Sequence, residues 1–531
     1  MLLIKIYLKK YYFCASFESI FMRKDMKTNI QKLLLFSSVI ILLASCSSKS
    51  TSGSSNTTGW KYNDKKGTGF VVKENYKSKV PPGMIAIEGG TYAIGEKGEV
   101  ITAPRNNLVR RITVNSFYMD QYEISNVNWR EYTNWMQLVF GKAAPKLVRN
   151  TQPNGEVWRE PLAYNEPYLE NYFYHPAYDN YPVVGITWEQ AMDYCAWRTD
   201  RVNELALINA GVIAAPDFSK LKNMSNVDSI AKSFVFNTKK YLYQRGYNPG
   251  AGKKALKDLY GQARKSDMAD GIMFSDFRLP TEAEWEFAAY AIRSNKNDGL
   301  VNQGKIYPWN GNQLRNTKKG KFLGEMQANY VRGRGDMMGT AGNLNDGAVI
   351  PTYVNSYSPN NFGLYNMAGN VNEWVLDVYR STSFDDVAEY NSFRGNAYQT
   401  ALAVSYDDLG NYLLKIDSLG RVVTVTKPGD DMRSFHDGDE TTQLNTDFPL
   451  GDPEGMKALS NKEKIDPTDI LAPKITDKTR VYKGGSWRDR AYWLNPSTRR
   501  YLEQDKSTND IGFRCAMSMI GDVKSQRVKR K

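Results

Sequence analysis

The chain has 531 residues, a formal net charge of +13 and an aromatic content of 12%, with 11 Trp and 34 Tyr. Residues 1–32 and residues 523–531 each contribute +5 to the charge, so the body between them carries only +3. This near balance argues against a nucleic-acid-binding surface, which would need a basic face. The aromatic content favours a loop-rich fold in which large flat side chains build the core.

The first marked segment is an apolar run over residues 33–44 that follows two lysines. This run is too short for a membrane-spanning helix, which needs about twenty residues, and it is typical of a signal peptide. It ends in Leu43-Ala44-Ser45-Cys46, which resembles a bacterial lipobox, whose cysteine is acylated and begins the mature chain. We therefore expect residues 1–45 to be a signal peptide, with translation starting at Met22 or Met26. The alternative is an ordinary signal peptide and a chance cysteine.

Residues 46–80 open with a run of serine, threonine and glycine that has nothing to bury. Such a composition predicts a flexible tether between the lipid on Cys46 and a folded domain. No acidic run follows the cysteine, which favours the periplasmic face of a membrane.

Residues 81–95 are predicted to form a strand, a glycine turn and a second strand, and residues 112–120 alternate as a further strand. Ser125 is a candidate N-cap for the next helix. Thr187-Trp188-Glu189-Gln190 fits a capping box, and Thr281-Glu282-Ala283-Glu284 repeats it.

Periodicity adds three expectations about helices. After the cap at Thr187, the spacing predicts one buried face. Two further helices are expected over Arg201–Asn209 and Ile230–Tyr243. The residues of the buried face are Trp188, Ala191, Met192 and Cys195.

Taken in order, eight segments resemble the formylglycine-generating enzyme, or sulfatase-modifying factor, family. The resemblance implies an α+β fold of the C-type-lectin-like kind over residues 81–519, with insertions near 199–276 and 380–479 and a basic tail over 520–531. The insertions either contact partners or serve no purpose, and the tail either contacts an acidic partner or lipid headgroups or is solvated. The matching segments are 83–95, 117–126, 182–197, 277–290, 307–309, 362–374, 480–487 and 512–516.

The same resemblance implies structural calcium, one or two ions, held by side-chain and backbone oxygens. Calcium takes six to eight hard oxygens from a flexible loop, and each matching segment supplies four. The alternative is that these polar groups only bond their own turns. The expected ligands are Asn366, Gly369, Val371 and Glu373 for one ion, and Asn329, Tyr330, Asp346 and Ala348 for the other.

The resemblance also implies a disulfide between Cys195 and Cys515. An extracytoplasmic compartment permits such a bond. Two buried free thiols are the alternative.

The redox cysteines of the enzymatic family members fall on Asp489 and Leu494, just past Gly484-Gly485-Ser486. Neither residue offers the soft sulfur ligand that copper(I) requires, so no copper is expected. Another branch of this fold holds iron with three histidines, whereas the chain has two, His175 and His436. We expect both to be solvated or locally bonded, and we predict no catalytic residue.

The lipobox, the insertions and residues 483–493 look most like the gliding-motility lipoproteins of Bacteroidetes. That resemblance implies a lipid-anchored outer-membrane protein on the periplasmic face, acting with other gliding and type IX secretion envelope proteins as a structural component. Two alternatives remain. One is an enzyme with a new carboxylate site around Asp489, and the other is a calcium-dependent module that binds glycans or peptidoglycan.

Overall fold

The computed structural model divides the chain into two units, residues 1–76 with 257–263 and residues 77–256 with 264–531. The predicted signal peptide, Cys46, Asp346, His436, most of the insertion near 380–479 and residues 522–531 of the tail lie outside the described residues. The structure describes residues 53–66, 70–72, 79–96, 107–227, 229–230, 234–244, 247, 249–254, 256–292, 305–317, 319–331, 348–380, 389–390, 392–393, 399–406, 412–415, 423–426 and 478–521.

The smaller unit contains short-range contacts within the segment predicted as a tether. Ser54 and Lys61 form an isolated antiparallel bridge. The Asn63 side chain donates to the Val72 carbonyl at 3.0 Å and accepts from the Val72 N–H at 2.9 Å. These residues therefore have local structure that their polar composition did not predict.

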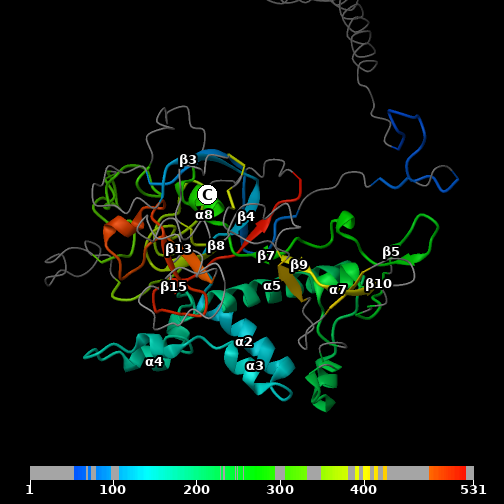
Figure 1. The fold of residues 1–531 in the computed structure, drawn as a ribbon, viewed down its shortest axis with the longest axis horizontal. Helices are drawn as coiled ribbons and strands as arrows, with labels where there is room; N and C mark the ends of the chain where they lie inside the picture. Colours follow the sequence, from blue (N-terminus) through cyan, green and yellow to red (C-terminus); the bar gives the residue numbers. More distant parts are fainter. Residues whose placement is uncertain are drawn as a thin grey trace, which may run out of the picture. The chain divides into compact units, whose positions relative to one another are not determined.

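Two four-stranded sheets organise the larger unit (Figure 1). One has the strand order β1-β4-β16-β7, and the other has the order β14-β13-β8-β15, in which β15 runs parallel to β8. Strands β2 and β3 form a separate antiparallel pair, as do β9 and β12, and β10 and β11. The strands are β1 (Met84–Ile87), β2 (Gly90–Ile94), β3 (Arg110–Val114), β4 (Phe117–Asp120), β5 (Leu256–Lys257), β6 (Ala263–Arg264), β7 (Phe277–Arg278), β8 (Asn372–Val378), β9 (Gln399–Ala401), β10 (Ala403–Tyr406), β11 (Tyr412–Leu414), β12 (Thr424–Thr426), β13 (Thr479–Lys483), β14 (Arg500–Glu503), β15 (Ile511–Gly512) and β16 (Ala516–Ser518).

Helices α2 to α5 occupy one side of this unit in Figure 1, and α8 lies with the sheets. None of the described helices combines the length and the apolarity that crossing a bilayer would need. The α-helices are α2 (Asn126–Phe140), α3 (Pro145–Asn150), α4 (Glu166–Asn171), α5 (Trp188–Ala210), α7 (Thr238–Tyr243) and α8 (Glu282–Tyr290); short 3₁₀ helices cover Gly155–Trp158, Pro176–Tyr178, Phe218–Asn223, Met268–Asp270 and Ala491–Leu494.

The predicted helix starts are confirmed. Thr187 Oγ1 accepts from the Gln190 N–H at 3.1 Å, and the Gln190 side-chain oxygen accepts from the Thr187 N–H at 2.9 Å. Thr281 and Glu284 make the same exchange at 3.2 and 2.9 Å. Ser125 is the N-cap residue of α2. Each reciprocal pair satisfies N–H groups that the first helical turn leaves without helical partners.

The predicted face of α5 is also confirmed. Ala191 and Cys195 are buried, and Trp188 and Met192 pack against the same core while remaining partly exposed. The helix predicted over Arg201–Asn209 exists as the continuation of α5, which runs on to residue 210.

The single helix predicted over Ile230–Tyr243 is wrong. Helix α7 starts only at Thr238, because the Asn237 side chain caps it by accepting from the Lys240 N–H at 2.9 Å. Asp200 on α5 accepts from the Thr238 N–H at 2.8 Å and fixes the same start.

The single strand predicted over residues 112–120 is two strands in different sheets. β3 pairs with β2, whereas β4 pairs with β1 and β16. The chain changes sheets at Asn115 and Ser116, where Ser116 Oγ accepts from the Gly89 N–H at 3.0 Å. A Cβ on Gly89 would stand 2.3 Å from the Val114 carbonyl oxygen, so the close crossing requires glycine there.

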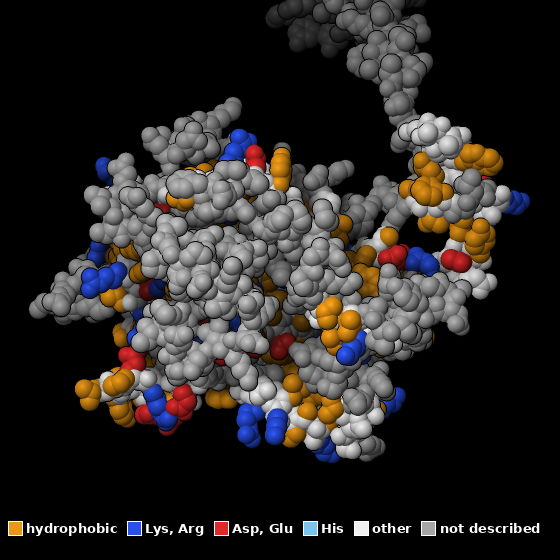
Figure 2. Space-filling view, in the orientation of Figure 1, with side chains coloured by type: hydrophobic (Ala, Val, Ile, Leu, Met, Phe, Trp, Pro, Cys, Tyr) orange, Lys and Arg blue, Asp and Glu red, His pale blue; other side chains and the backbone are white. Residues whose placement is uncertain are grey.

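Aromatic side chains fill the core, as their abundance predicted. Trp129 is fully buried. Its ring stacks on that of Tyr194 with the centroids 5.3 Å apart, and it makes an edge contact with Phe513 with the centroids 5.8 Å apart. On the other side of the sheets, all nine residues of α8 are buried, and the helix packs against β2, β3 and β8. Figure 2 shows that acidic, basic and hydrophobic side chains are interspersed on the face that it draws.

The two cysteines of the predicted disulfide lie side by side in the core. The sulfur atoms of Cys195 and Cys515 are 3.5 Å apart, and both residues are buried as thiols. Burial and the neighbouring sulfur raise the pKa of the Cys515 thiol well above its usual value. The fold therefore brings together two residues that are 320 positions apart in sequence, and the bond itself stays a prediction.

We expect the chain isolated from an oxidising compartment to contain the bond between Cys195 and Cys515. Closing so long a loop stabilises the folded state by on the order of 5 kcal/mol in the chain-entropy model. Peptide mapping under non-reducing conditions should recover one linked peptide pair, and urea unfolding should show a lower midpoint after reduction. Two alkylated thiols in the oxidised sample would contradict the prediction.

Candidate functional site

The candidate site is the loop after β13, where two glycines let the chain turn between large side chains. Gly484 has φ +105° and Gly485 has φ +72°, both in the region that favours glycine. A Cβ on Gly484 would lie 3.1 Å from the Trp285 ring, and one on Gly485 would lie 2.7 Å from the Trp493 carbonyl oxygen. This tight path delivers Ser486, which is fully buried, to the centre of the site.

Asp489, where the resemblance places the first redox cysteine, closes this loop with an ion pair. Its carboxylate accepts from the Ser486 N–H and hydroxyl at 2.8 and 2.7 Å. Arg500 on β14 donates to both carboxylate oxygens, at 2.6 and 2.7 Å. Burial raises the pKa of Asp489, but the hydrogen bonds and charge of Arg500, with those of Ser486 and Asn372, outweigh burial and hold the pKa below its usual value. The carboxylate of Asp489 is therefore ionised, and its oxygens are occupied by hydrogen bonds that hold the loop.

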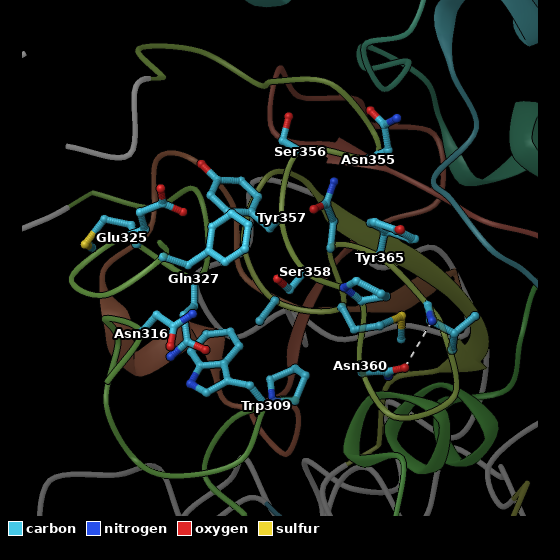
Figure 3. Close-up of a pocket in the computed structure, with 18 residues that line it drawn as sticks. Trp309, Asn316, Glu325, Gln327, Asn355, Ser356, Tyr357, Ser358, Asn360 and Tyr365 are labelled. Carbon is cyan, nitrogen blue, oxygen red and sulfur yellow. Dashed lines mark hydrogen bonds between the residues drawn. The ribbon is translucent and has the colours of Figure 1, made fainter. Parts of the chain in front are cut away.

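Leu494, where the resemblance places the second redox cysteine, is part of the core. It has no exposed surface and belongs to an apolar cluster that includes Tyr307, Met326 and Ala368. Met326 and Ala368 also form part of the wall of a neighbouring pocket (Figure 3). Neither of these two positions thus presents a group that could transfer electrons.

A second segment packs against the loop. The rings of Trp487 and Trp158 stack with centroids 6.2 Å apart. Arg488 pairs with Glu160 at 2.6 Å and donates to Asn509 Oδ1 at 2.8 Å. The end of the 3₁₀ helix at Gly155–Trp158 and the residues that follow it therefore lie against the loop after β13.

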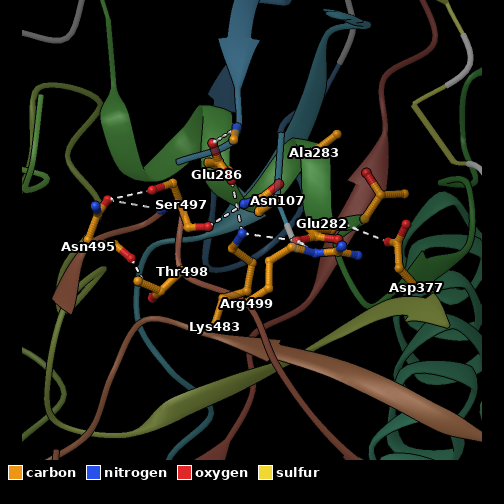
Figure 4. A network of polar contacts seen from close by, with 12 residues as sticks. Asn107, Glu282, Ala283, Glu286, Asp377, Lys483, Asn495, Ser497, Thr498 and Arg499 are labelled. Carbon is orange, nitrogen blue, oxygen red and sulfur yellow. Dashed lines mark hydrogen bonds and ion pairs between the residues drawn. The ribbon is translucent and has the colours of Figure 1, made fainter. Parts of the chain in front are cut away.

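A buried charge network holds the loop from behind (Figure 4). Lys483, directly before the two glycines, has no exposed side-chain surface and donates to Glu282 and Glu286 of α8 at 3.1 and 2.9 Å. Arg499 donates to Glu282 at 2.7 Å, and Asp377 accepts from the Glu282 N–H at 2.6 Å. These contacts join α8, β8 and β13 behind the site.

Two carboxyl groups of this network have pKa values shifted in opposite directions. Burial raises the pKa of Glu282, but Arg499 and Lys483 outweigh burial and lower the pKa to about 2. Burial, together with repulsion from Glu282, raises the pKa of Asp377 to about 7. This network was not predicted from the sequence. The feature that could have indicated it is the set of acidic residues on α8, a helix that is otherwise apolar.

In the first predicted calcium set, other side chains already engage Glu373, which disfavours calcium there. Arg514 donates to both oxygens of Glu373 at 2.6 and 2.7 Å, and the Trp285 indole donates to one of them at 2.8 Å. A guanidinium this close repels a divalent cation, and it already uses the ligand oxygens. The loop turns at Gly369, which has φ +78°.

Asn366 is the member of that set that fits a cation. It lies at φ +52°, and its side-chain oxygen is buried without a hydrogen-bond partner among the described residues. Its amide nitrogen donates to Glu123 at 2.9 Å, as does that of Asn370. Burial and repulsion from Glu373 raise the pKa of Glu123 to about 8. Sequence reasoning missed Glu123, which lies far from the motif in sequence.

The second calcium set is only partly described, because Asp346 lies outside the described residues. Asn329 is buried, its amide nitrogen donates to the Ile350 carbonyl at 3.0 Å, and its carbonyl accepts from the Asn370 N–H at 2.9 Å. Tyr330 is buried beside it, and Ala348 is partly exposed.

His175 is locally bonded, as predicted. Its Nδ1 accepts from the Ala177 N–H at 3.1 Å and caps the 3₁₀ helix at Pro176–Tyr178.

Comparison with known proteins places this geometry in a family. Residues 70–415 match the Sulfatase-modifying factor enzyme 1-like domain. The chain belongs to this family. Its mixed helices and sheets, joined by long loops, confirm the predicted α+β fold of the C-type-lectin-like kind.

The similar members of the sulfatase-modifying factor family include proteins named as active and as inactive. The chain is 24% identical to the formylglycine-generating enzyme of Mus musculus over 317 residues, which are 55% of this chain and 58% of that protein. It is 36% identical to the inactive C-alpha-formylglycine-generating enzyme 2 of Mus musculus over 109 residues, 20% and 28% of the two chains. PvdO from Pseudomonas aeruginosa has a TM-score of 0.39 at 13% identity, covering 82% of this chain and 94% of that one. The chain thus spans about three-fifths of the mouse enzyme that it matches.

We expect the substitution Asp489→Asn to lower the free energy of unfolding by about 2 kcal/mol at pH 7, a value between those of exposed and of fully buried ion pairs. Arg500 would lose its charged partner, while both side chains are less than one-fifth exposed. Because the pKa of Asp489 is depressed in the folded state, its stabilising effect is present above the unfolded pKa of about 4 and is lost as the pH falls further.

Urea unfolding between pH 3 and 7 measures this difference. The control is Asp505→Asn, which removes an exposed acid and should change stability little. An unchanged stability of Asp489→Asn at pH 7 would show that the ion pair contributes nothing to the fold.

We expect at most one calcium ion per chain, bound by the set that includes Asp346. We do not expect calcium at the set that includes Asn366, because its carboxylate ligand, Glu373, forms an ion pair with Arg514. Isothermal titration of the metal-stripped protein should give a stoichiometry of one or less, and Asp346→Asn should abolish binding. Two ions per chain would show that Glu373 exchanges Arg514 for calcium.

Proposed function

We propose that this protein is a non-catalytic, lipid-anchored component of the bacterial cell envelope that serves gliding motility or type IX protein secretion. The observation that carries the proposal is the state of the former redox site. One position is an aspartate held by Arg500, and the other is a leucine with no exposed surface. Copper-dependent thiol oxidation of the kind expected of the enzymatic family members would need sulfur at both positions.

The surroundings of the site support the same proposal. Trp158 and Glu160 pack against Trp487 and Arg488, so other parts of the protein cover this side of the loop. A family that contains a relative named as inactive also accommodates a member without activity.

The anchor and the partners rest on the sequence. The segment ending in Cys46 has the form of a lipobox, and an acylated cysteine would hold the domain at the periplasmic face of the outer membrane. The likeness to gliding-motility lipoproteins supports other gliding and type IX secretion proteins of the envelope as partners. The nearly neutral body offers no support for nucleic acid as a partner.

The proposal predicts that deleting the gene in its native host abolishes surface spreading, type IX cargo secretion, or both. The wild-type gene should restore the lost trait, and Cys46→Ala should not, because the protein would lose its lipid. Ser48→Ala is the matched control and should restore it. Normal spreading and secretion in the deletion strain would contradict the proposal.

A second arm separates a structural role from catalysis. Purified protein supplied with copper(I), oxygen and a cysteine-containing sulfatase peptide should yield no formylglycine, whereas an active family member should. Complementation by Asp489→Asn, at matched protein level, should restore the trait. Formylglycine formation would overturn the non-catalytic assignment.

A further inference from the structure

One pocket of the larger unit has the walls of a ligand site and shares only Asn366, Met326 and Ala368 with the site described above. It has a volume of about 510 Å³, within the usual range of about 300–1,000 Å³ for small-molecule sites. Two segments form it, residues 308–327 and residues 355–368. Ser486, Asp489 and Arg500 are not among the residues that line it.

An aromatic platform is fixed in one wall. The ring of Trp309 stacks on that of Tyr307, with centroids 4.9 Å apart and planes 17° apart. Trp309 lines the pocket and Tyr307 does not, so Tyr307 supports the indole from behind. The indole N–H donates to the Gln313 carbonyl at 2.8 Å, which fixes the ring in its plane. The platform is thus held in place before any ligand arrives.

Neutral polar groups surround this platform. The amide nitrogen of Gln327 donates to the same Gln313 carbonyl at 2.8 Å, which holds this side chain beside the indole. Figure 3 shows Asn316 and Gln327 near Trp309, with Tyr357 farther from the indole and Asn355 and Ser356 at another part of the pocket. Amides and hydroxyls of this kind both donate and accept hydrogen bonds.

The charge of the walls restricts the ligand. The lining residues include no lysine, arginine or histidine, and one carboxylate, that of Glu325. Phosphates, nucleotides and sulfated polymers need cationic partners, so this lining does not suit them. The many amides and hydroxyls do not suit a hydrocarbon, because an apolar ligand would leave them without hydrogen bonds.

We propose that this pocket binds a neutral saccharide. A sugar ring has one flat face of C–H groups, which packs on an aromatic ring such as Trp309, and a rim of hydroxyls that pair with amides and hydroxyls. The volume accommodates a short oligosaccharide. The proposal rests on the pocket alone and stands or falls independently of the envelope role.

The test is saturation-transfer NMR and isothermal titration of the full processed chain with chitotetraose, cellotetraose, maltotetraose and mannotetraose. At least one should bind, and Trp309→Ala should weaken it by about tenfold or more. Gln327→Ala should weaken it less. Trp60→Ala removes an exposed indole of the smaller unit and should leave affinity unchanged.

Sugar binding should be unchanged when EDTA is added, since the proposed contacts in the pocket need no calcium. Heparin tetrasaccharide and a neutral tetrapeptide serve as competing ligand classes and should not bind. Failure of all four neutral sugars at millimolar concentration, tighter binding of either competitor, or equal affinity of a folded Trp309→Ala variant would overturn the proposal.

Discussion

The pairing of Lys483 with two glutamates of α8 is the interaction on which the rest of the structure depends. Burying an ammonium group costs several kcal/mol, and only nearby opposite charges offset that cost. Lys483 has no exposed side-chain surface, and Glu282 and Glu286 meet it at 3.1 and 2.9 Å. Helix α8 is therefore held against β13 at one register, because sliding by one turn would leave the buried charges unpaired.

From this fixed helix the contacts extend to both large sheets. Trp285 of α8 donates to Glu373 on β8, and Glu373 in turn pairs with Arg514 next to β16. The same indole packs within 3.1 Å of where a Cβ on Gly484 would lie, so the path of the loop depends on the position of the helix. A single buried helix thus sets the geometry of the sheets and of the former redox site.

Local chemistry explains which features the sequence could predict. The caps at Thr187 and Thr281 were predictable because both partners lie within three residues of each other. The start of α7 was not, because Asp200, from another helix, helps to fix it. Glu373 pairs with Arg514, 141 positions away, and Asp489 pairs with Arg500, 11 positions away. The spacing of residues within a motif does not predict which carboxylate such a distant arginine will pair with. The aspartate and leucine at the lost cysteine positions were evident from the sequence, but their ion pair and burial were not.

The burial of Leu494 affects how readily this loop could acquire a pair of cysteines at positions 489 and 494. Cysteine at 494 would open a cavity in a closed apolar cluster, at a cost on the order of 2 kcal/mol. Cysteine at 489 would leave Arg500 without its carboxylate partner. Each substitution is unfavourable by itself, so packing and charge together oppose the appearance of the pair.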